Sequence, residues 1–168
     1  MRLVAPLLGA RAGRRGRRLV FVVAAVAAFH STVEPAPADT DYGAPEKVLR
    51  WARENFALCL LRLDDEPRRT RLQRLAQWTE EEFRRRADWF AARRAGGFIR
   101  ECHGDLHLGN MVLADAGQVM IFDCSEFTDD LRWIDVISDL AFLTMDLRFR
   151  GAGGFAQRVL NTYLEYSG

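Results

Sequence analysis

The sequence predicts a mainly helical α+β domain, and three observations lead to this prediction. Segments with apolar residues at helical spacing cover most of the chain after residue 18. A single pair of short apolar runs, 111–113 and 119–122, flanks a turn and predicts a β-hairpin. The length of 168 residues, of which 49% are hydrophobic and 28% charged, suits one domain with a substantial core.

The N-terminal segment divides into two parts. Residues 1–17 are rich in glycine, arginine and alanine, and we expect a disordered, arginine-rich head there. The apolar run 19–29 that follows imitates the apolar region of a signal peptide, but eleven residues are too few to cross a membrane. We therefore favour a buried helix over 19–30, at the start of a domain that spans 18–168.

Further helices are predicted along the rest of this domain. A proline-rich loop over 31–45 separates the first helix from the next one. Apolar periodicity, together with the helix-breaking sequences DDEP at 64–67 and AGG at 95–97, sets their boundaries. The predicted helices cover 46–63, 68–94, 130–147 and 155–166.

Charge and cysteine content argue against a nucleic-acid-binding protein and against a disulfide-linked one. Six arginines precede Glu34, the first acidic residue, and the rest of the chain has 18 basic against 23 acidic residues, a net charge of −5. An acidic body of this kind is not a nucleic-acid-binding surface. The three cysteines include no CxxC pair, which argues against a disulfide framework and favours a reducing, cytoplasmic location.

The strongest chemical pattern is HGDLHLGN at 103–110. His103, Asp105 and Asn110 follow the spacing H-x-D-L-x-x-x-N, and Asp123 ends the second strand of the predicted hairpin. Phosphoryl transfer needs a carboxylate near the acceptor hydroxyl and hard oxygen ligands for Mg²⁺ at the nucleotide phosphates. These side chains supply both, and the glycines of the loop allow the backbone to turn sharply.

With IFDCSEF at 121–127 and DVISDLA at 135–141, this loop resembles the aminoglycoside phosphotransferase family. The resemblance is dense over 98–147 and closest to a branch in which the domain is fused to a C-terminal P-loop ATP-binding domain. It implies an α+β, mainly α fold: the C-terminal (large) lobe of a protein-kinase-like fold with a catalytic β-hairpin. It also implies transfer of the γ-phosphate of ATP to a small-molecule hydroxyl, with Mg²⁺ as cofactor.

The resemblance assigns roles to the matching residues. Asp105 would be the catalytic base, and Asn110 and Asp123 would bind Mg²⁺ and, through it, the nucleotide. Asp139 would tie down the backbone of the catalytic loop. Asp135, four residues earlier, is expected on the same helix face and in the same supporting role, because two carboxylates so close need donors.

The histidines and cysteines of this region allow an alternative interpretation. We interpret His103 as a structural residue hydrogen-bonded inside the loop, while His107 could reach substrate or pack. A zinc hydrolase could instead draw its ligands from Cys102, His103, Asp105, His107 or Cys124. Neither CxxC nor H-E-x-x-H spacing is present, so we read the two cysteines as small apolar residues near strand ends.

A complete enzyme of this kind also has a β-rich small lobe, which covers the phosphates and carries a strand lysine. The residues ahead of the catalytic loop are predicted to be helical, and the sole lysine, Lys47, stands at the start of a predicted helix. We therefore expect the small lobe to be absent. One hypothesis is a phosphotransferase that is weakly active or inactive alone and needs a separate small lobe or P-loop domain. The other is a non-catalytic remnant or binding module that keeps the fold.

Overall fold

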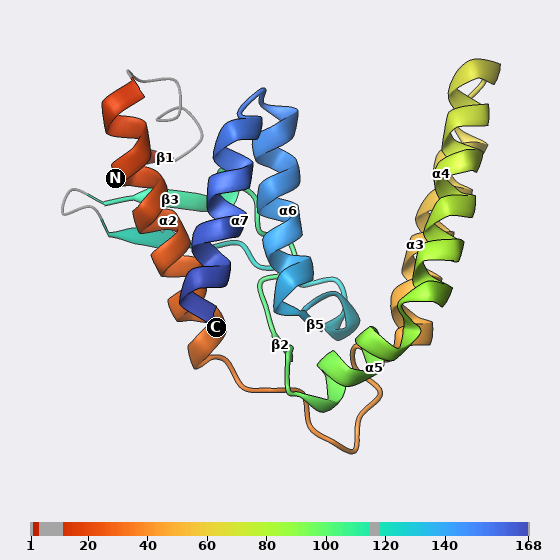
Figure 1. Cartoon of the computed structure of the whole chain (residues 1–168), viewed down its shortest axis with the longest axis horizontal. Helices are drawn as coiled ribbons and strands as arrows, with labels where there is room; N and C mark the ends of the chain where they lie inside the picture. Colours follow the sequence, from red (N-terminus) through yellow and green to blue (C-terminus); the bar gives the residue numbers. More distant parts are fainter. Residues whose placement is uncertain (1, 4–11, 115–117, 168) are drawn as a thin grey trace.

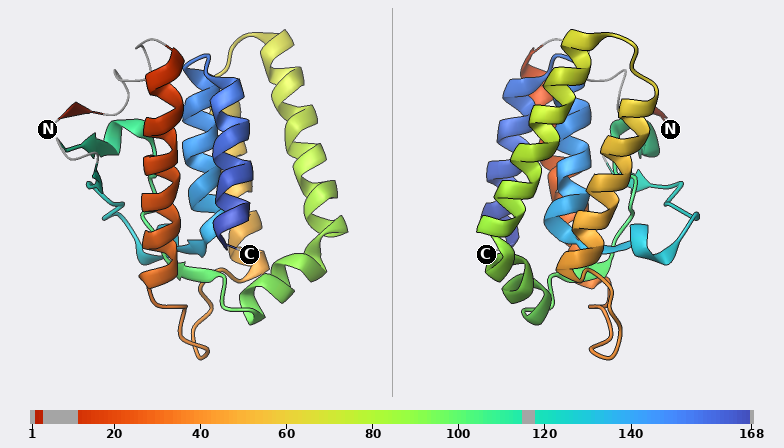
Figure 2. Two further views of the ribbon diagram at one scale, coloured as in Figure 1. Left: turned by 60° about the vertical axis from the view of Figure 1, so that its left-hand side comes forward. Right: turned by 90° about the vertical axis from the view of Figure 1, so that its right-hand side faces the viewer.

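A computed structural model of the full chain shows a layer of helices beside a small hairpin (Figure 1). The structure describes residues 2–3, 12–114 and 118–167, and the side chains from residue 20 onward within these ranges. Helices α2 (Ala12–Thr32), α6 (Val136–Phe149) and α7 (Gly153–Ser167) lie side by side (Figure 2). The fold is α+β and mainly α, as predicted.

The core lies between these helices and the loop that precedes the hairpin. Its largest contributors are apolar residues at helical spacing on α2, α6 and α7, together with two leucines of the loop. The buried members are Val22, Val23, Val26, Leu106, Leu108, Met111, Leu140, Leu143, Leu147, Ala156, Val159 and Tyr163. Burial of each large apolar side chain stabilises the fold by about 1.5–3 kcal/mol. The loop is therefore anchored in the core through its own leucines.

Among the described residues, two small antiparallel sheets hold the ends of this loop. Strand β3 (Met111–Leu113) lies between β1 (Arg2–Leu3) and β4 (Val119–Ile121). Strand β2 (Ile99–Glu101) pairs with β5 (Trp133–Asp135). The loop over 102–110 leaves one sheet and enters the other, so both of its ends are fixed. The predicted hairpin is confirmed by β3 and β4.

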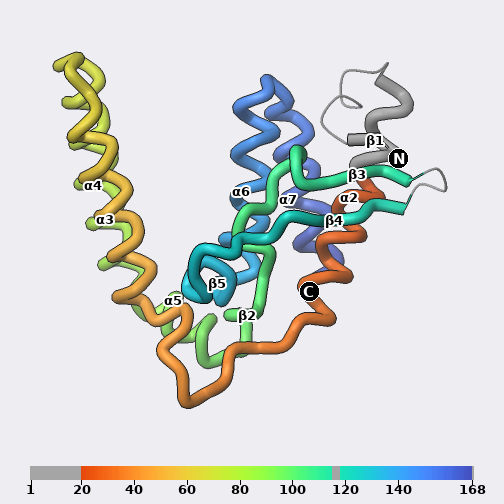
Figure 3. Tube along the Cα trace, turned by 180° about the vertical axis from the view of Figure 1, so that it is seen from behind, coloured from red at the N-terminus to blue at the C-terminus, as the bar shows by residue number. Residues whose placement is uncertain are grey.

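Helices α3 (Pro45–Leu61) and α4 (Glu66–Arg85) form an antiparallel hairpin that stands apart from α2, α6 and α7 (Figures 1 and 3). We call this hairpin the helical arm. The side chain of Asp65 caps α4 by accepting a hydrogen bond of 2.8 Å from the Arg68 N–H. No residue of α4 is buried, and an ion pair between Arg53 and Glu80 joins the two helices.

The prediction of one helix over 68–94 is wrong at Arg86. The chain bends there, and a separate helix, α5 (Ala87–Ala95), begins. Neither glycine nor proline marks the bend, and across it the Phe90 ring of α5 packs on Phe83 of α4, with ring centroids 4.9 Å apart. The bend also carries Arg93 to the start of α6, where it pairs with an aspartate.

The prediction of a helix from residue 130 is also wrong in its first six residues. A 3₁₀ turn, η2 (Asp129–Leu131), and strand β5 precede α6, which starts only at Val136. Asp135 explains the start, because its carboxylate accepts the Ile137 N–H at 2.8 Å and so caps the helix. The predicted helix over 155–166 is confirmed by α7.

At the N-terminus, α2 begins at Ala12, earlier than the residue 19 expected from its apolar run. Within the predicted disordered head, residues 1 and 4–11 lie outside the described residues, and residues 12–17 belong to α2 instead. In the described part of the chain, no helix is both long and apolar enough to span a membrane.

Candidate active site

The loop over 102–110 exposes Asp105 while burying its neighbours. Leu106 and Leu108 are fully buried, whereas the Asp105 side chain is 47% exposed. At the start of the loop, the Cys102 N–H donates to the Arg132 carbonyl at 2.8 Å. The Asp105 carboxylate therefore extends toward solvent from a backbone that the core and a sheet edge hold in place.

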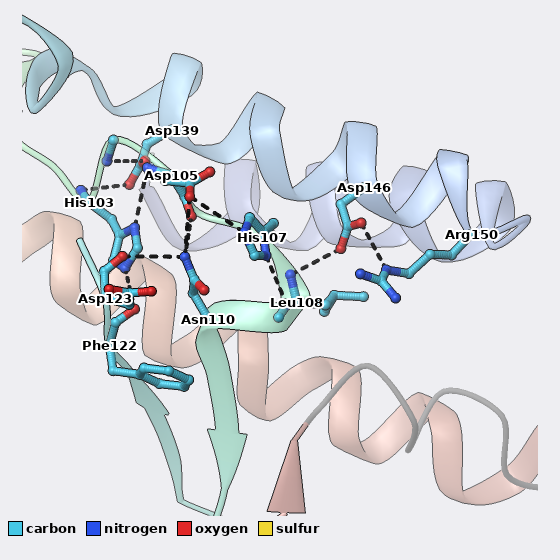
Figure 4. Close-up of polar contacts among 12 residues, drawn as sticks. His103, Asp105, His107, Leu108, Asn110, Phe122, Asp123, Asp139, Asp146 and Arg150 are labelled. Carbon is cyan, nitrogen blue, oxygen red and sulfur yellow. Dashed lines mark hydrogen bonds and ion pairs between the residues drawn. The ribbon is translucent and has the colours of Figure 1, made fainter. Parts of the chain in front are cut away.

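Asn110 connects Asp105 to Asp123 (Figure 4). Its amide Nδ2 lies 3.1 Å from the Asp105 carbonyl, 3.4 Å from the Asp105 carboxylate and 3.3 Å from the Asp123 carbonyl. The Phe122 N–H donates to the Asn110 carbonyl at 3.0 Å, which ties the end of β4 to the end of the loop. The structure thus brings together the three residues to which the sequence assigned chemistry.

Asp123 has an unusual backbone for a residue with a side chain. Its φ of 61° lies in the left-handed region, which aspartate tolerates better than most residues and which is often found at functional sites. Its carboxylate is exposed and receives no hydrogen bond from the described residues. The Asn110 side-chain carbonyl likewise has no donor among them. A carboxylate and an amide oxygen suit Mg²⁺, which takes further ligands from phosphates and water, so these two residues fit that ion.

Asp139 contacts the backbone of the loop directly. The side chain is fully buried, and its two oxygens accept the His103 N–H at 3.1 Å and the Gly104 N–H at 3.0 Å (Figure 4). Gly104 has a φ of 77°, and a Cβ there would stand 2.4 Å from the Leu131 carbonyl oxygen. The loop can therefore approach both Asp139 and Leu131 only because residue 104 is glycine.

A buried chain of polar residues behind Asp139 was not predicted from the sequence. His30, at the end of α2, donates from Nε2 to the Asp139 carboxylate at 3.0 Å, and its Nδ1 lies 2.8 Å from the Tyr163 hydroxyl of α7. Burial raises the pKa of Tyr163 to about 12, with smaller contributions from nearby negative charges. His30 follows Val22 and Val26 at four-residue spacing, and this place on the apolar face was the signal available in the sequence.

Asp146 supports the loop at a second point, which sequence reasoning also missed. Its carboxylate accepts the Leu108 N–H at 3.0 Å and pairs with Arg150 at 2.8 Å (Figure 4). Asp146 lies seven residues after Asp139, two turns further along the same face of α6, so the spacing was a usable signal.

The two loop histidines make different contacts. His103 is buried, and its Nδ1 accepts the Asp105 N–H at 3.3 Å while its Nε2 lies 2.8 Å from the Phe122 carbonyl. This arrangement links the loop to the end of β4. His107 is partly exposed, with Nδ1 accepting the Gly109 N–H at 3.0 Å and Nε2 at 3.5 Å from the Asp105 carboxylate.

The expected position of Asp135 is wrong. It precedes α6 as its cap, and its carboxylate pairs with both Arg93 nitrogens, Nη2 to Oδ1 at 2.8 Å and Nε to Oδ2 at 2.5 Å. None of the described hydrogen bonds joins it to the loop over 103–110. Asp135 therefore fastens α5 to the start of α6, and its influence on the loop is indirect.

The ligands expected for a zinc hydrolase do not come together. Within the described residues, the one group of three ligand atoms close enough for a metal is His30, Cys102 and Asp139, and all three are buried. Cys124 is exposed and outside that group. Burial, reinforced by neighbouring Asp139 and Asp135, raises the pKa of the Cys102 thiol, which opposes the thiolate that zinc requires. The thiol instead lies 3.4 Å from the Ile134 carbonyl as a donor.

Lys47 is also not available to bind a phosphate. It lies near the start of α3, where its Nζ is 2.7 Å from Asp41 and 2.8 Å from Asp130. These two carboxylates raise its pKa and leave the ammonium group engaged within the protein.

A mainly helical domain that brings an exposed loop aspartate, an asparagine and an aspartate at the end of a hairpin together has the groups that phosphoryl transfer requires. Comparison with known families agrees, since the model of the "Phosphotransferase enzyme family" matches residues 2–168. The chain belongs to this family.

The curated relatives are mycobacterial. The uncharacterized proteins Rv2004c and MT2060 of Mycobacterium tuberculosis and Mb2027c of Mycobacterium bovis are each 32% identical over 143 residues. The match covers 85% of this chain but only 28% of each relative, so the chain spans less than a third of their length. No solved structure shows significant similarity to the chain.

Proposed function

We propose that this chain carries the catalytic loop of an ATP-dependent phosphotransferase whose acceptor is a hydroxyl group on a small molecule. The observation that carries the proposal is the set of contacts made by the Asn110 amide, which joins Asp105 to Asp123. Family membership supports phosphoryl transfer in general.

Each residue would have a defined task. Asp105 is exposed and accepts the proton of the attacking hydroxyl. Asn110 and Asp123 hold Mg²⁺, which when bound neutralises charge on the nucleotide phosphates. Asp139 and His103 keep the loop in position through the hydrogen bonds described above. Asp135 acts on the loop only indirectly, through its place at the start of α6.

We further propose that the chain alone transfers phosphate weakly or not at all. Lys47 is engaged by two carboxylates, so among the described residues no lysine is available to the phosphates. The relatives are more than three times as long as the matched segment, which leaves room for a separate small lobe or a P-loop domain. One of these would supply the phosphate-covering loop.

The test is a calorimetric titration of the purified chain with ATP, in the presence and absence of Mg²⁺. We expect weak binding that depends on Mg²⁺ and is lost in Asp123→Asn. The matched control is Asp129→Asn, which changes an exposed aspartate in η2 outside the cluster. Asp105→Asn should bind MgATP like the parent protein, because its carboxylate faces the acceptor rather than the metal.

The outcomes separate the two functional hypotheses. Equal MgATP binding by Asp123→Asn and Asp129→Asn would contradict the metal assignment. Absence of any nucleotide binding, even when the unmatched part of a mycobacterial relative is added, would favour a non-catalytic module that keeps the fold.

A further inference from the structure

A cavity opens between the helical arm and the start of α6, beside the catalytic loop. Its volume is about 200 Å³, and its wall includes Gly104, the chain neighbour of Asp105. Gly104 is pressed against Leu131, another wall residue, so the position of the proposed base is fixed relative to this space. The cavity is smaller than the roughly 300–1,000 Å³ pockets that hold drug-sized ligands, and suits a molecule with a single ring.

Aromatic and aliphatic side chains form most of the wall. Trp51 comes from α3, Trp133 from β5 and Phe142 from α6, so the surfaces come from three separate elements. Trp133 is held in place by stacking on Tyr42, with ring centroids 5.2 Å apart and planes within 9°. Flat aromatic walls of this kind bind the apolar face of a ring.

The charged groups of the wall are already paired with each other or with neighbours. Asp130 lies 2.8 Å from the Lys47 ammonium, and Asp135 binds Arg93 through two contacts. Lys47, the remaining charged wall residue, is held by Asp130 and Asp41. The cavity therefore presents little net charge, and a cationic ligand would lose its hydration without gaining a free carboxylate.

One polar atom in the wall lacks a partner. Trp51 Nε1 is buried and has no hydrogen-bond acceptor among the described residues. Burial of such a donor without a partner is unfavourable. Because this nitrogen is buried, a ligand oxygen in the cavity would supply the missing acceptor only after the indole ring rotates.

We propose that this cavity binds the phosphoryl acceptor, and that the acceptor is an uncharged alcohol with a ring or flat apolar face rather than a polycation. The acceptor role rests on the function proposed above, whereas the charge preference rests on the wall alone. An alcohol combines an apolar body for the two tryptophans with a hydroxyl for Asp105, which follows the wall residue Gly104 in the chain.

The test uses two probes of the same shape, cyclohexylmethanol and cyclohexylmethylamine, which is cationic at neutral pH. Indole N–H signals of the ¹⁵N-labelled chain report on the cavity through Trp51 and Trp133, and Trp89, 67% exposed on α5, is the internal control. We expect saturable shifts of the two cavity signals by the alcohol, at least about tenfold weaker binding of the amine, and no change at Trp89.

Two pairs of variants make the test specific. Ser138→Phe fills the cavity from an exposed wall position and should abolish the shifts, whereas Ala141→Phe, exposed on the same helix outside the wall, should not. Lys47→Met leaves Asp130 in contact with Arg50 at 3.5 Å, whereas Lys47→Met combined with Arg50→Met frees Asp130 and should raise the affinity for the amine about fivefold or more. Equal binding of the two probes by the parent protein, or shifts that survive in Ser138→Phe, would overturn the proposal.

A separate experiment tests whether the ligand in the cavity is the phosphoryl acceptor. Mn²⁺ bound at Asn110 and Asp123 should broaden the carbinol protons of cyclohexylmethanol, and Asp123→Asn should remove the broadening. Binding without broadening, in a chain whose MgATP binding depends on Asp123, would overturn the acceptor assignment while leaving the proposed function intact. Binding with no MgATP affinity would instead contradict the proposed function and leave the cavity as a site for an alcohol.

Discussion

Replacing Asp139 with alanine tests whether the position of the catalytic loop depends on α6. The substitution removes the acceptor for three donors: the backbone N–H groups of His103 and Gly104, and Nε2 of His30. Each buried donor left unpaired costs about 1–3 kcal/mol. Part of this cost is offset, because a buried carboxylate no longer has to be desolvated.

We therefore expect Asp139→Ala to lower the free energy of unfolding by about 2–5 kcal/mol. In a domain of this size each kcal/mol corresponds to about 2–4 °C, so the melting temperature should fall by about 4–20 °C. Asp139→Asn keeps one acceptor oxygen and should fall between the parent protein and Asp139→Ala. Differential scanning calorimetry at neutral pH measures all three proteins.

Asp105→Ala is the matched comparison, since it removes the other aspartate of the cluster. Its carboxylate is 47% exposed, and Asn110 keeps two backbone acceptors without it. We expect a change within about 0.5 kcal/mol. If Asp105→Ala lowers the melting temperature more than Asp139→Ala does, the division between a chemical and a supporting residue is wrong.

Three further predictions concern the residues around the loop. Between pH 10 and about 12 the folded protein keeps the Tyr163 proton that the unfolded chain loses. The free energy of unfolding should therefore fall by up to about 2–3 kcal/mol as the pH rises through this range. Urea titrations should show a smaller fall for Tyr163→Phe. Arg93→Ala removes the ion pair that joins α5 to Asp135, and it should lower the free energy of unfolding by about 1–2 kcal/mol. Backbone amides of α5 should then exchange faster, and unchanged exchange would contradict this role. In the absence of nucleotide, Mn²⁺ should bind weakly to the parent protein and not to a variant that lacks Asp123, and water proton relaxation measures this binding. Stoichiometric zinc in the purified protein that is lost in Cys102→Ala would instead support a zinc site.

Local sequence patterns predicted the catalytic loop and its hairpin well, because their signals are short-range. The spacing of Asp105 and Asn110 and the strand before Asp123 determine which residues can meet, and the structure brings them together. Helices with clear apolar periodicity, such as α3 and α7, were likewise found within two or three residues of their bounds.

Some missed features depend on contacts between distant segments. The bend at Arg86 does not: it brings Phe90 onto Phe83, only seven residues away, and helix propensity does not encode it. Asp135 was placed on a helix face because apolar residues on both sides of it fit a helix as well as a strand. Its pairing with Arg93, 42 residues earlier, was not visible in the sequence. The missed link from His30 to Asp139 spans 109 residues.

The polar chain from α2 through α6 to α7 also bears on the order of events during synthesis. His30 and Tyr163 are 133 residues apart, so the hydrogen bond between them forms only after α7 has left the ribosome. A nascent polypeptide that ends before α7 already contains every residue of the catalytic loop, but Val22 and Val26 still lack the helix that α2 packs against. During that interval the apolar face of α2 is open to chaperones and to aggregation.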